Sequence, residues 1–368
     1  MHTSNSKPPV CGETNRFNAA DLLQRDPIEL DPANIQKVIV NSIVLITGAA
    51  GSIGSELAWQ ICSYHPFKII LIDQAETPLN DLDIRLSQQF RNVIIQSYPA
   101  NITDAVRMEM IFSNAKPQIV FHTAAYKHVP FMENHPYEAI STNVFGTKIL
   151  ADLAIAHAVS RFIFISTDKA VKPSSIMGAT KHIAELYIQY LARNECFKTQ
   201  YVITRFGNVL GSNGSFMPTF EKQIRAGGPI TITHPDVRRY MMTIPEACQL
   251  VLEAGATGKN GAILFFDMGR PIKILDIAKR MIALTGHNVD DINIEYIGLR
   301  PGEKLCEELY DDCQISENVT QSKILVSTNQ ESALCPENML QMLRKALESG
   351  NDEEMKNAIW RALPEFSD

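Results

Sequence analysis

Short apolar runs and longer helix-forming stretches alternate through most of this sequence of 368 residues. The runs have strand length and are apolar almost throughout, which is typical of strands buried on both faces. We predict strands at Ile43–Thr47, Lys68–Asp73, Asn92–Gln96, Ile119–His122, Phe162–Ser166 and Tyr201–Arg205. We predict helices between them at Ile53–Tyr64, Thr77–Phe90, Ala105–Asn114, Pro136–His157 and Met177–Asn194. This alternation favours an α/β fold with a doubly wound parallel sheet of Rossmann type.

The pattern loosens after Phe206, where glycines crowd a loop-rich stretch. A late strand at Ala262–Asp267, a helix at Ile274–Thr285 and two helices within Pro336–Leu363 follow. We therefore expect four parts, numbered 1–40, 41–205 with 240–275, 206–239 with 276–330, and 331–368. They are a tail with a lead-in helix, a nucleotide-binding domain, a smaller loop-rich substrate-binding domain, and C-terminal helices.

Composition excludes several classes of protein. A net charge of −7 gives no general attraction for nucleic acid or acidic membranes. The seven cysteines are dispersed without a CxxC pair, which indicates reduced thiols rather than disulfides or a zinc site. No apolar run approaches the ~18–20 residues of a membrane span, and the polar first residues do not resemble a signal peptide. We expect a cytoplasmic protein with no membrane span, no nucleic-acid partner and no metal.

A glycine-rich turn follows the first predicted strand and opens a helix. It reads Gly48-Ala49-Ala50-Gly51-Ser52-Ile53-Gly54, and Asp73 ends the second strand. Glycines at these positions permit a tight turn, close approach to a pyrophosphate and close helix packing, with an acidic residue about 20 positions later for the ribose. The carboxylate would repel a 2′-phosphate, and Gln74 follows it, so NAD is favoured over NADP. At Asn101-Ile102, the amide either meets the adenine or only shapes a turn.

The stretch Phe162–Lys181 carries the candidate chemistry. Its strand leads into Ser166-Thr167-Asp168-Lys169, and a helix follows in which Met177 and Lys181 lie one turn apart. Ligands of open α/β sheets bind outside the carboxyl ends of the strands, so an acid, a base and a hydroxyl would face the ligand. The alternative is an ordinary surface ion pair between Asp168 and Lys169.

Several motifs together resemble one family, the nucleotide-sugar 4,6-dehydratases among the extended short-chain dehydrogenase/reductases. The motifs are the glycine turn, Asn143-Val144-x-Gly146-Thr147 with Lys181, Ala124-Ala125-Tyr126-Lys127-His128-Val129-Pro130, Ser166-Thr167-Asp168-Lys169-Ala170-Val171, Arg205-Phe206-Gly207-Asn208-Val209-Leu210-Gly211-Ser212, Thr233-His234-Pro235 and Arg300-Pro301-Gly302-Glu303-Lys304. The resemblance covers about residues 20–320. It implies a lyase that forms UDP-4-keto-6-deoxy-N-acetylglucosamine from UDP-N-acetylglucosamine with tightly bound, regenerated NAD.

Two positions depart from the family pattern. Met177 stands where the wider superfamily has a catalytic tyrosine, and this resembles the branch that retains configuration at C5. Asn101 stands where relatives more often have aspartate. Because a thioether cannot carry a proton, the C4 hydroxyl proton must pass to Asp168 or to a water held by Thr167; the sequence leaves both open.

The resemblance assigns the remaining roles. Asp168 would be the acid toward the C6 hydroxyl with a raised pKa, and Lys169 the base at C5 with a lowered pKa. Thr167 would bind the C4 oxygen, Met177 would line the sugar pocket, and Lys181 would hold the nicotinamide ribose. Further cofactor contacts are expected at Ser52, Ile53, Ala124, Ala125 and Asn143.

We expect the sugar nucleotide to meet Lys127 near the sugar, Asn208, and the guanidinium groups of Arg239 and Arg300 at the diphosphate. Homo-oligomers could form through the helices Pro136–His157 and Met177–Asn194. Alternatives are a GDP-linked substrate, a C5-inverting dehydratase, a 4-epimerase, or a protein that binds NAD without catalysis.

Overall fold

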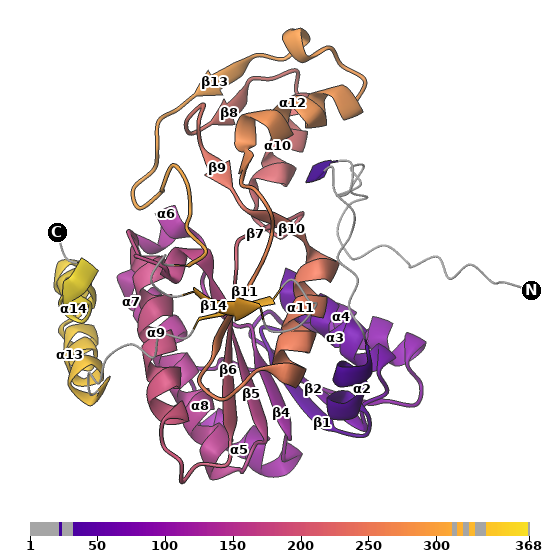
Figure 1. Cartoon of the computed structure of the whole chain (residues 1–368), viewed down its shortest axis with the longest axis vertical. Coiled ribbons are helices and arrows are strands. Elements are labelled where there is room, and N and C mark those ends of the chain that lie inside the picture. Colours follow the sequence, from indigo (N-terminus) through magenta and orange to yellow (C-terminus); the bar gives the residue numbers. More distant parts are fainter. Residues whose placement is uncertain (1–21, 24–31, 311–314, 319–323, 328–335, 367–368) are drawn as a thin grey trace, which may run out of the picture.

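A computed structural model describes residues 22–23, 32–310, 315–318, 324–327 and 336–366. Its centre is a nine-stranded sheet with the order β14-β15-β11-β6-β5-β4-β1-β2-β3 (Figure 1). These strands are β1 Ile43–Thr47, β2 Lys68–Asp73, β3 Ile94–Pro99, β4 Ile119–His122, β5 Arg161–Thr167, β6 Gln200–Phe206, β11 Ile263–Phe266, β14 Ile315–Asn318 and β15 Ile324–Ser327. All pairs from β3 to β11 are parallel, whereas β15 joins β11 and β14 antiparallel. The predicted doubly wound, mostly parallel sheet is confirmed.

The apolar strands serve two cores because successive side chains point to opposite faces. In β5, Phe162 and Phe164 join one core, and Ile163 and Ile165 join the other. The helices α5 Ala105–Ala115, α8 Thr147–Ala156 and α9 Ile176–Ala192 cover the first face. The helices α2 Ala33–Ile39, α3 Ser52–Ser63, α4 Glu76–Gln89 and α11 Ile244–Thr257 cover the second. Burial on both faces is why these strands are apolar almost throughout.

A smaller lobe lies beyond one end of the sheet, at the top of Figure 1. It contains the helices α10 Phe216–Arg225 and α12 Ile274–Leu284 with the paired strands β8 Ile230–Ile232 and β13 Ile294–Tyr296. The short pairs β7 Asn208–Leu210 with β10 Met241–Thr243, and β9 Arg238–Arg239 with β12 Ile272–Lys273, connect it to the sheet domain. The lobe has its own apolar core, to which Leu22 and Leu23 add side chains.

The observed elements differ from the expected ones in several places. The strands β14 and β15 extend the large sheet, although the sequence-based division assigned 276–330 to the smaller domain. The expected helix Pro136–His157 consists of α7 Pro136–Glu138, a π-helical stretch Ala139–Gly146 and α8. The third strand begins at Ile94 rather than Asn92. Of the expected tail and lead-in at 1–40, residues 1–21 and 24–31 lie outside the described part of the chain.

The C-terminal helices pack on the sheet domain. They are α13 Pro336–Ser349 and α14 Asp352–Arg361, the pair that the sequence predicted around Ser349-Gly350-Asn351. Their buried side chains, among them Leu343 and Ile359, share a core with α9 and the π-helical stretch. The chain therefore covers part of the apolar helical face that we had assigned to association with a second copy.

One continuous helical run within the described residues, Pro136–Ala156, has the length and apolar composition of a membrane span. Half of its most apolar window, 50%, is buried inside the fold. Because α5 and α9 pack against its α8 portion, we interpret the run as a core helix of the sheet domain.

Candidate active site

The glycine turn after β1 is built by close contacts. Gly48 has a φ of +65°, and a Cβ there would lie 2.7 Å from the backbone of Ala124. A Cβ on Gly54 would lie 2.2 Å from the Gly48 carbonyl oxygen. Helix α3 then starts after Gly51 without a side-chain cap, so the N–H groups of Ser52 and Ile53 have no intrahelical acceptor. This is a cradle for a pyrophosphate.

Asp73 lies beside this turn at the end of β2. One carboxylate oxygen accepts a hydrogen bond from the Ala50 N–H, and the other accepts one from the Ala75 N–H, both at 2.9 Å. The carboxylate is thus held in place against the glycine turn. A ribose attached to a pyrophosphate in the turn would lie beside it. These residues fit an NAD molecule, as the sequence predicted.

The other predicted cofactor residues differ in their exposure. The Gln74 amide donates to the Tyr126 hydroxyl at 3.2 Å. The exposed Asn101 accepts from the Thr103 N–H at 3.0 Å, which is the turn-forming alternative, and Ile102 is buried against Gly146. Ala124 and Ala125 follow β4 and are half-buried.

The side chain of Asn143, another predicted cofactor residue, is fully buried. It accepts from the Tyr126 N–H at 2.9 Å and donates to the Tyr126 carbonyl at 3.1 Å. Its amide is therefore occupied with shaping the segment after β4, and any influence on a cofactor would pass through that backbone.

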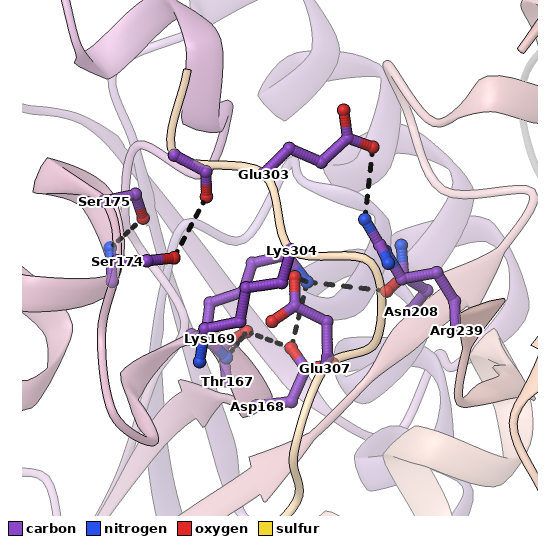
Figure 2. Close-up of polar contacts among 12 residues, drawn as sticks. Thr167, Asp168, Lys169, Ser174, Ser175, Asn208, Arg239, Glu303, Lys304 and Glu307 are labelled. Carbon is purple, nitrogen blue, oxygen red and sulfur yellow. Dashed lines mark hydrogen bonds and ion pairs between the residues drawn. The ribbon is translucent and has the colours of Figure 1, made fainter. Parts of the chain in front are cut away.

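The carboxyl end of β5 places three polar side chains together (Figure 2). The Thr167 hydroxyl donates to Asp168 Oδ1 at 2.9 Å, and Lys169 Nζ donates to the same oxygen at 3.0 Å. Lys169 also donates to Asn208 Oδ1 at 3.4 Å. Asp168 is fully buried, and its Oδ2 has no hydrogen-bond partner among the described residues. An orphaned buried oxygen at a strand end suits a ligand hydroxyl.

A second carboxylate, Glu307, reaches Lys169 from a distant segment. Its Oε1 lies 3.6 Å from Lys169 Nζ, its side chain is 4% exposed, and its Oε2 has no partner among the described residues. Burial raises the pKa of Glu307, and the charge of Lys169 opposes that rise. We had not selected Glu307 from the sequence. The sequence signal that could have identified it is its position three residues after the Arg300–Lys304 motif.

The predicted lowering of the Lys169 pKa is wrong for the ligand-free protein. Burial alone would lower this pKa, but the carboxylates of Asp168 and Glu307 outweigh burial and the repulsion from Arg239, so the pKa is raised. Lys169 is therefore an ammonium ion in the state described.

Met177 and Lys181 lie on the first turns of α9. Met177 is 3% exposed and packs in the apolar core of that face. Lys181 donates to the Ile165 carbonyl at 2.7 Å and lies 3.9 Å from the centre of the Phe164 ring. Burial lowers its pKa to about 7, and the charge of Glu185 opposes the shift. Helix α9 packs directly on the segment after β5, because a Cβ on Gly178 would lie 2.2 Å from the Lys169 carbonyl oxygen.

The predicted substrate residues do not all meet at this site. Arg239 is buried and forms an ion pair with Glu303 at 3.1 Å. Lys127 is exposed as a whole, and its Nζ lies 3.5 Å from Ser212 Oγ, where partial desolvation and then repulsion from Lys169 lower its pKa. Arg300, by contrast, is exposed; its backbone N–H donates to Glu303 Oε2 at 3.2 Å, and its carbonyl accepts from the Glu303 N–H at 3.0 Å.

Segment 300–310 connects the lobe to the carboxyl end of β5. Lys304 Nζ donates to the carbonyls of Val171 at 3.0 Å and Lys172 at 2.7 Å. Gly302 has a φ of +73°, and a Cβ there would lie 2.7 Å from Ser175. These contacts hold segment 300–310 across residues 169–175, so Glu307 and Arg239 lie in one site with Asp168.

No group of three or more residues suited to a metal occurs in the described ranges.

Comparisons with known proteins agree with this architecture. A family model described as polysaccharide biosynthesis protein matches residues 44–329. The chain is 49% identical over 311 residues to the capsular polysaccharide biosynthesis protein CapD of Staphylococcus aureus, covering 84% of this chain and 52% of that protein. It thus spans about half the length of this relative. A UDP-glucose 4-epimerase of Rickettsia canadensis is 32% identical over 277 residues, covering 74% of this chain and 78% of that protein. The X-ray structure of Pen from Bacillus thuringiensis matches with a TM-score of 0.73 and 30% identity, covering 84% of this chain and 98% of that one.

Proposed function

The chain belongs to the polysaccharide biosynthesis protein family, and on that premise we propose that it is an NAD-dependent nucleotide-sugar 4,6-dehydratase. Its substrate would be UDP-N-acetylglucosamine and its product UDP-4-keto-6-deoxy-N-acetylglucosamine. The observation that carries the proposal is the hydrogen-bonded cluster of Thr167, Asp168 and Lys169 at the end of β5, in which Asp168 is fully buried. Helix α9, which packs on this segment, carries Met177 rather than a phenol.

The cofactor site supports the redox part of this reaction. The turn at residues 48–54 and the carboxylate of Asp73 would hold NAD, whose chemistry is to take a hydride from the sugar C4 and return it to C6. Because the cofactor ends each cycle oxidised, catalytic amounts are sufficient and no external reductant is needed.

Proton handling falls to residues of this chain. The Thr167 hydroxyl donates to Asp168, so the C4 hydroxyl proton can pass through Thr167 to the Asp168 carboxylate. Lys169 first releases its ammonium proton to solvent and then takes the C5 proton as an amine, while Asp168 gives its proton to the C6 hydroxyl, which leaves as water. Lys169 then returns a proton to C5. Each positioned acid or base contributes typically 10²–10⁴-fold in rate.

Retention of configuration at C5 is part of the proposal. Met177 cannot deliver a proton, and the described cluster offers one ammonium ion, Lys169, for C5. If the same amine removes and returns the proton, it does so from one face of the sugar ring.

The second candidate is a 4-epimerase, which the similarity to the Rickettsia canadensis protein favours. An epimerase returns the hydride to C4 and needs neither a base at C5 nor an acid at C6. Incubation with UDP-N-acetylglucosamine and catalytic NAD separates the two by mass. A dehydratase forms a product lighter by one water, an epimerase forms an isomer, and a protein that only binds NAD forms neither. The GDP-linked sugar, assayed in parallel, tests the choice of base.

Cytoplasmic location and homo-oligomer formation are also proposals. Since α13 and α14 cover part of α9, a second copy would have to use helical surface they leave open, such as the half-buried Ile149 and Leu153 of α8. Light scattering at several protein concentrations tests this contact.

A further inference from the structure

The catalytic lysine has a charge partner from outside its own segment. Lys169 and Asp168 are sequence neighbours, whereas Glu307 belongs to segment 300–310. Lys304 holds this segment in place through hydrogen bonds to the carbonyls of Val171 and Lys172. Glu307 is 4% exposed and makes no hydrogen bond through Oε2 within the described residues. A carboxylate that is buried at a cost in solvation usually has a compensating role beside a cation.

The proposed reaction requires Lys169 as a neutral amine at C5, but in the ligand-free protein it lies within reach of two carboxylates. Asp168 has its own task, because its proton must go to the C6 oxygen. Glu307 lies at 3.6 Å from Nζ and is, in the described part of the chain, the other carboxylate that pairs with the amine. Its charge therefore decides how readily Lys169 gives up its proton before the reaction and how well it holds the C5 proton afterwards.

We propose that Glu307 is a positioning residue for Lys169: its buried carboxylate holds the ammonium group in place and sets the pH range in which Lys169 serves as the C5 base. The inference rests on the proposed dehydratase reaction. The direction of the effect follows from charge alone, since a nearby anion favours the protonated lysine.

Other charged groups face this pair and stay in place when Glu307 is changed. Around Lys169 these are Asp168, Arg239 and Lys127, and around Glu307 they are Lys169, Asp168, Arg239 and Lys304. Arg239 and Lys127 carry positive charge and oppose the protonated lysine, so Asp168 and Glu307 are the groups that favour it. Removing Glu307 must therefore lower the pKa of Lys169.

The test uses Glu307→Gln, which keeps the shape and removes the charge, and Glu307→Met as a second neutral variant. Glu308→Gln is the matched control, because Glu308 is the adjacent carboxylate and pairs with the exposed Lys172 at 3.2 Å. Trace acetylation of the ligand-free proteins across pH, read at the Lys169 peptide by mass spectrometry, reports the pKa of Lys169 without any need for activity. The pH dependence of kcat with UDP-N-acetylglucosamine reports the base in action.

We expect the Lys169 labelling midpoint to move down by about one to three pH units in both Glu307 variants, as Coulomb's law gives at this distance between water-like and protein-like dielectrics. The acidic limb of kcat should move the same way, and Glu308→Gln should match the wild type. Dehydration by all proteins with unmoved midpoints in both Glu307 variants would overturn the inference. A labelling shift without dehydration in any protein would instead overturn the proposed reaction and leave the control of Lys169 by Glu307 standing.

Discussion

Two lysine–glutamate pairs join the same two segments of this protein, and they differ in burial. Lys169 and Glu307 have side chains that are 20% and 4% exposed, and a second carboxylate, Asp168, lies beside them. Lys172 and Glu308 are 45% exposed each and pair at 3.2 Å. Water screens the outer pair, so its charges barely influence each other. Burial of the inner pair makes each charge control the protonation of its neighbour.

A third lysine separates the effect of burial from the effect of carboxylates. Lys181 is also buried, but it donates to a backbone carbonyl, and Glu185 is its counter-charge. Its pKa is lowered to about 7, whereas the pKa of Lys169 is raised. Lys181 is 4% exposed and Lys169 is 20% exposed, so burial acts on both, and the two carboxylates in contact with Lys169 reverse the direction there.

The largest effect is expected at the acid of the inner cluster. Asp168→Asn keeps the hydrogen bonds but removes the proton carrier, so turnover should fall by about 10²–10⁴-fold. NAD affinity, measured by fluorescence titration, should stay within a factor of a few because Asp168 lies outside the glycine turn. Near-normal turnover by this variant would remove Asp168 from the mechanism.

Weakening the attachment of segment 300–310 should have the next largest effect, on both stability and turnover. Lys304→Met removes two charge-assisted hydrogen bonds to the carbonyls of Val171 and Lys172. We expect a loss of about 1.5–3 kcal/mol in the free energy of unfolding, and a lower kcat as Glu307 moves from Lys169. Urea unfolding measures the first quantity, and Lys172→Met serves as the exposed control. An unchanged unfolding curve would show that these bonds do not hold the segment.

The contrast between Lys169 and Lys181 can be tested through pH. Between about pH 7 and the ordinary lysine value of 10.5, the unfolded chain binds a proton at Lys181 that the folded chain does not. The contribution to stability therefore rises with pH across this interval, by at most about 1.4 kcal/mol per pH unit. Ligand-free Lys181→Met should lack this rise, and denaturant unfolding at several pH values measures it. Equal slopes for both proteins would contradict the lowered pKa.

The smallest effect is expected at the outer pair. Glu308→Gln should change the free energy of unfolding by less than about 0.5 kcal/mol and leave kcat at the wild-type value. A loss of turnover comparable to that of the Glu307 variants would erase the distinction between the two pairs.

The sequence predicted what depends on neighbouring residues. Apolar runs located β1, β2, β4 and β5 closely, because strands buried on both faces show their burial in composition. The glycine turn and Asp73 could also be predicted as a nucleotide-binding motif, since a turn, a helix start and the end of the next strand lie within one local unit.

The rest depended on contacts between distant segments. Glu307 was not predicted as a site residue, because the sequence Glu307-Glu308 does not show which of the two side chains is buried. The Lys169 pKa was predicted in the wrong direction for the same reason, since one of its two carboxylate neighbours was unknown. The cover of α9 by α13 and α14 likewise follows from packing that no local pattern encodes.

The most direct test of the account is the fate of the C5 hydrogen during turnover in deuterium oxide. Lysine carries three equivalent ammonium hydrogens, two of which come from solvent when it takes up the C5 proton. We predict a product that has lost one water, carries solvent deuterium at C5 in most molecules with unchanged configuration, and forms without accumulation of NADH. An isomer that retains its water, or a dehydrated product without deuterium at C5, would contradict the assignment of Lys169 as the base.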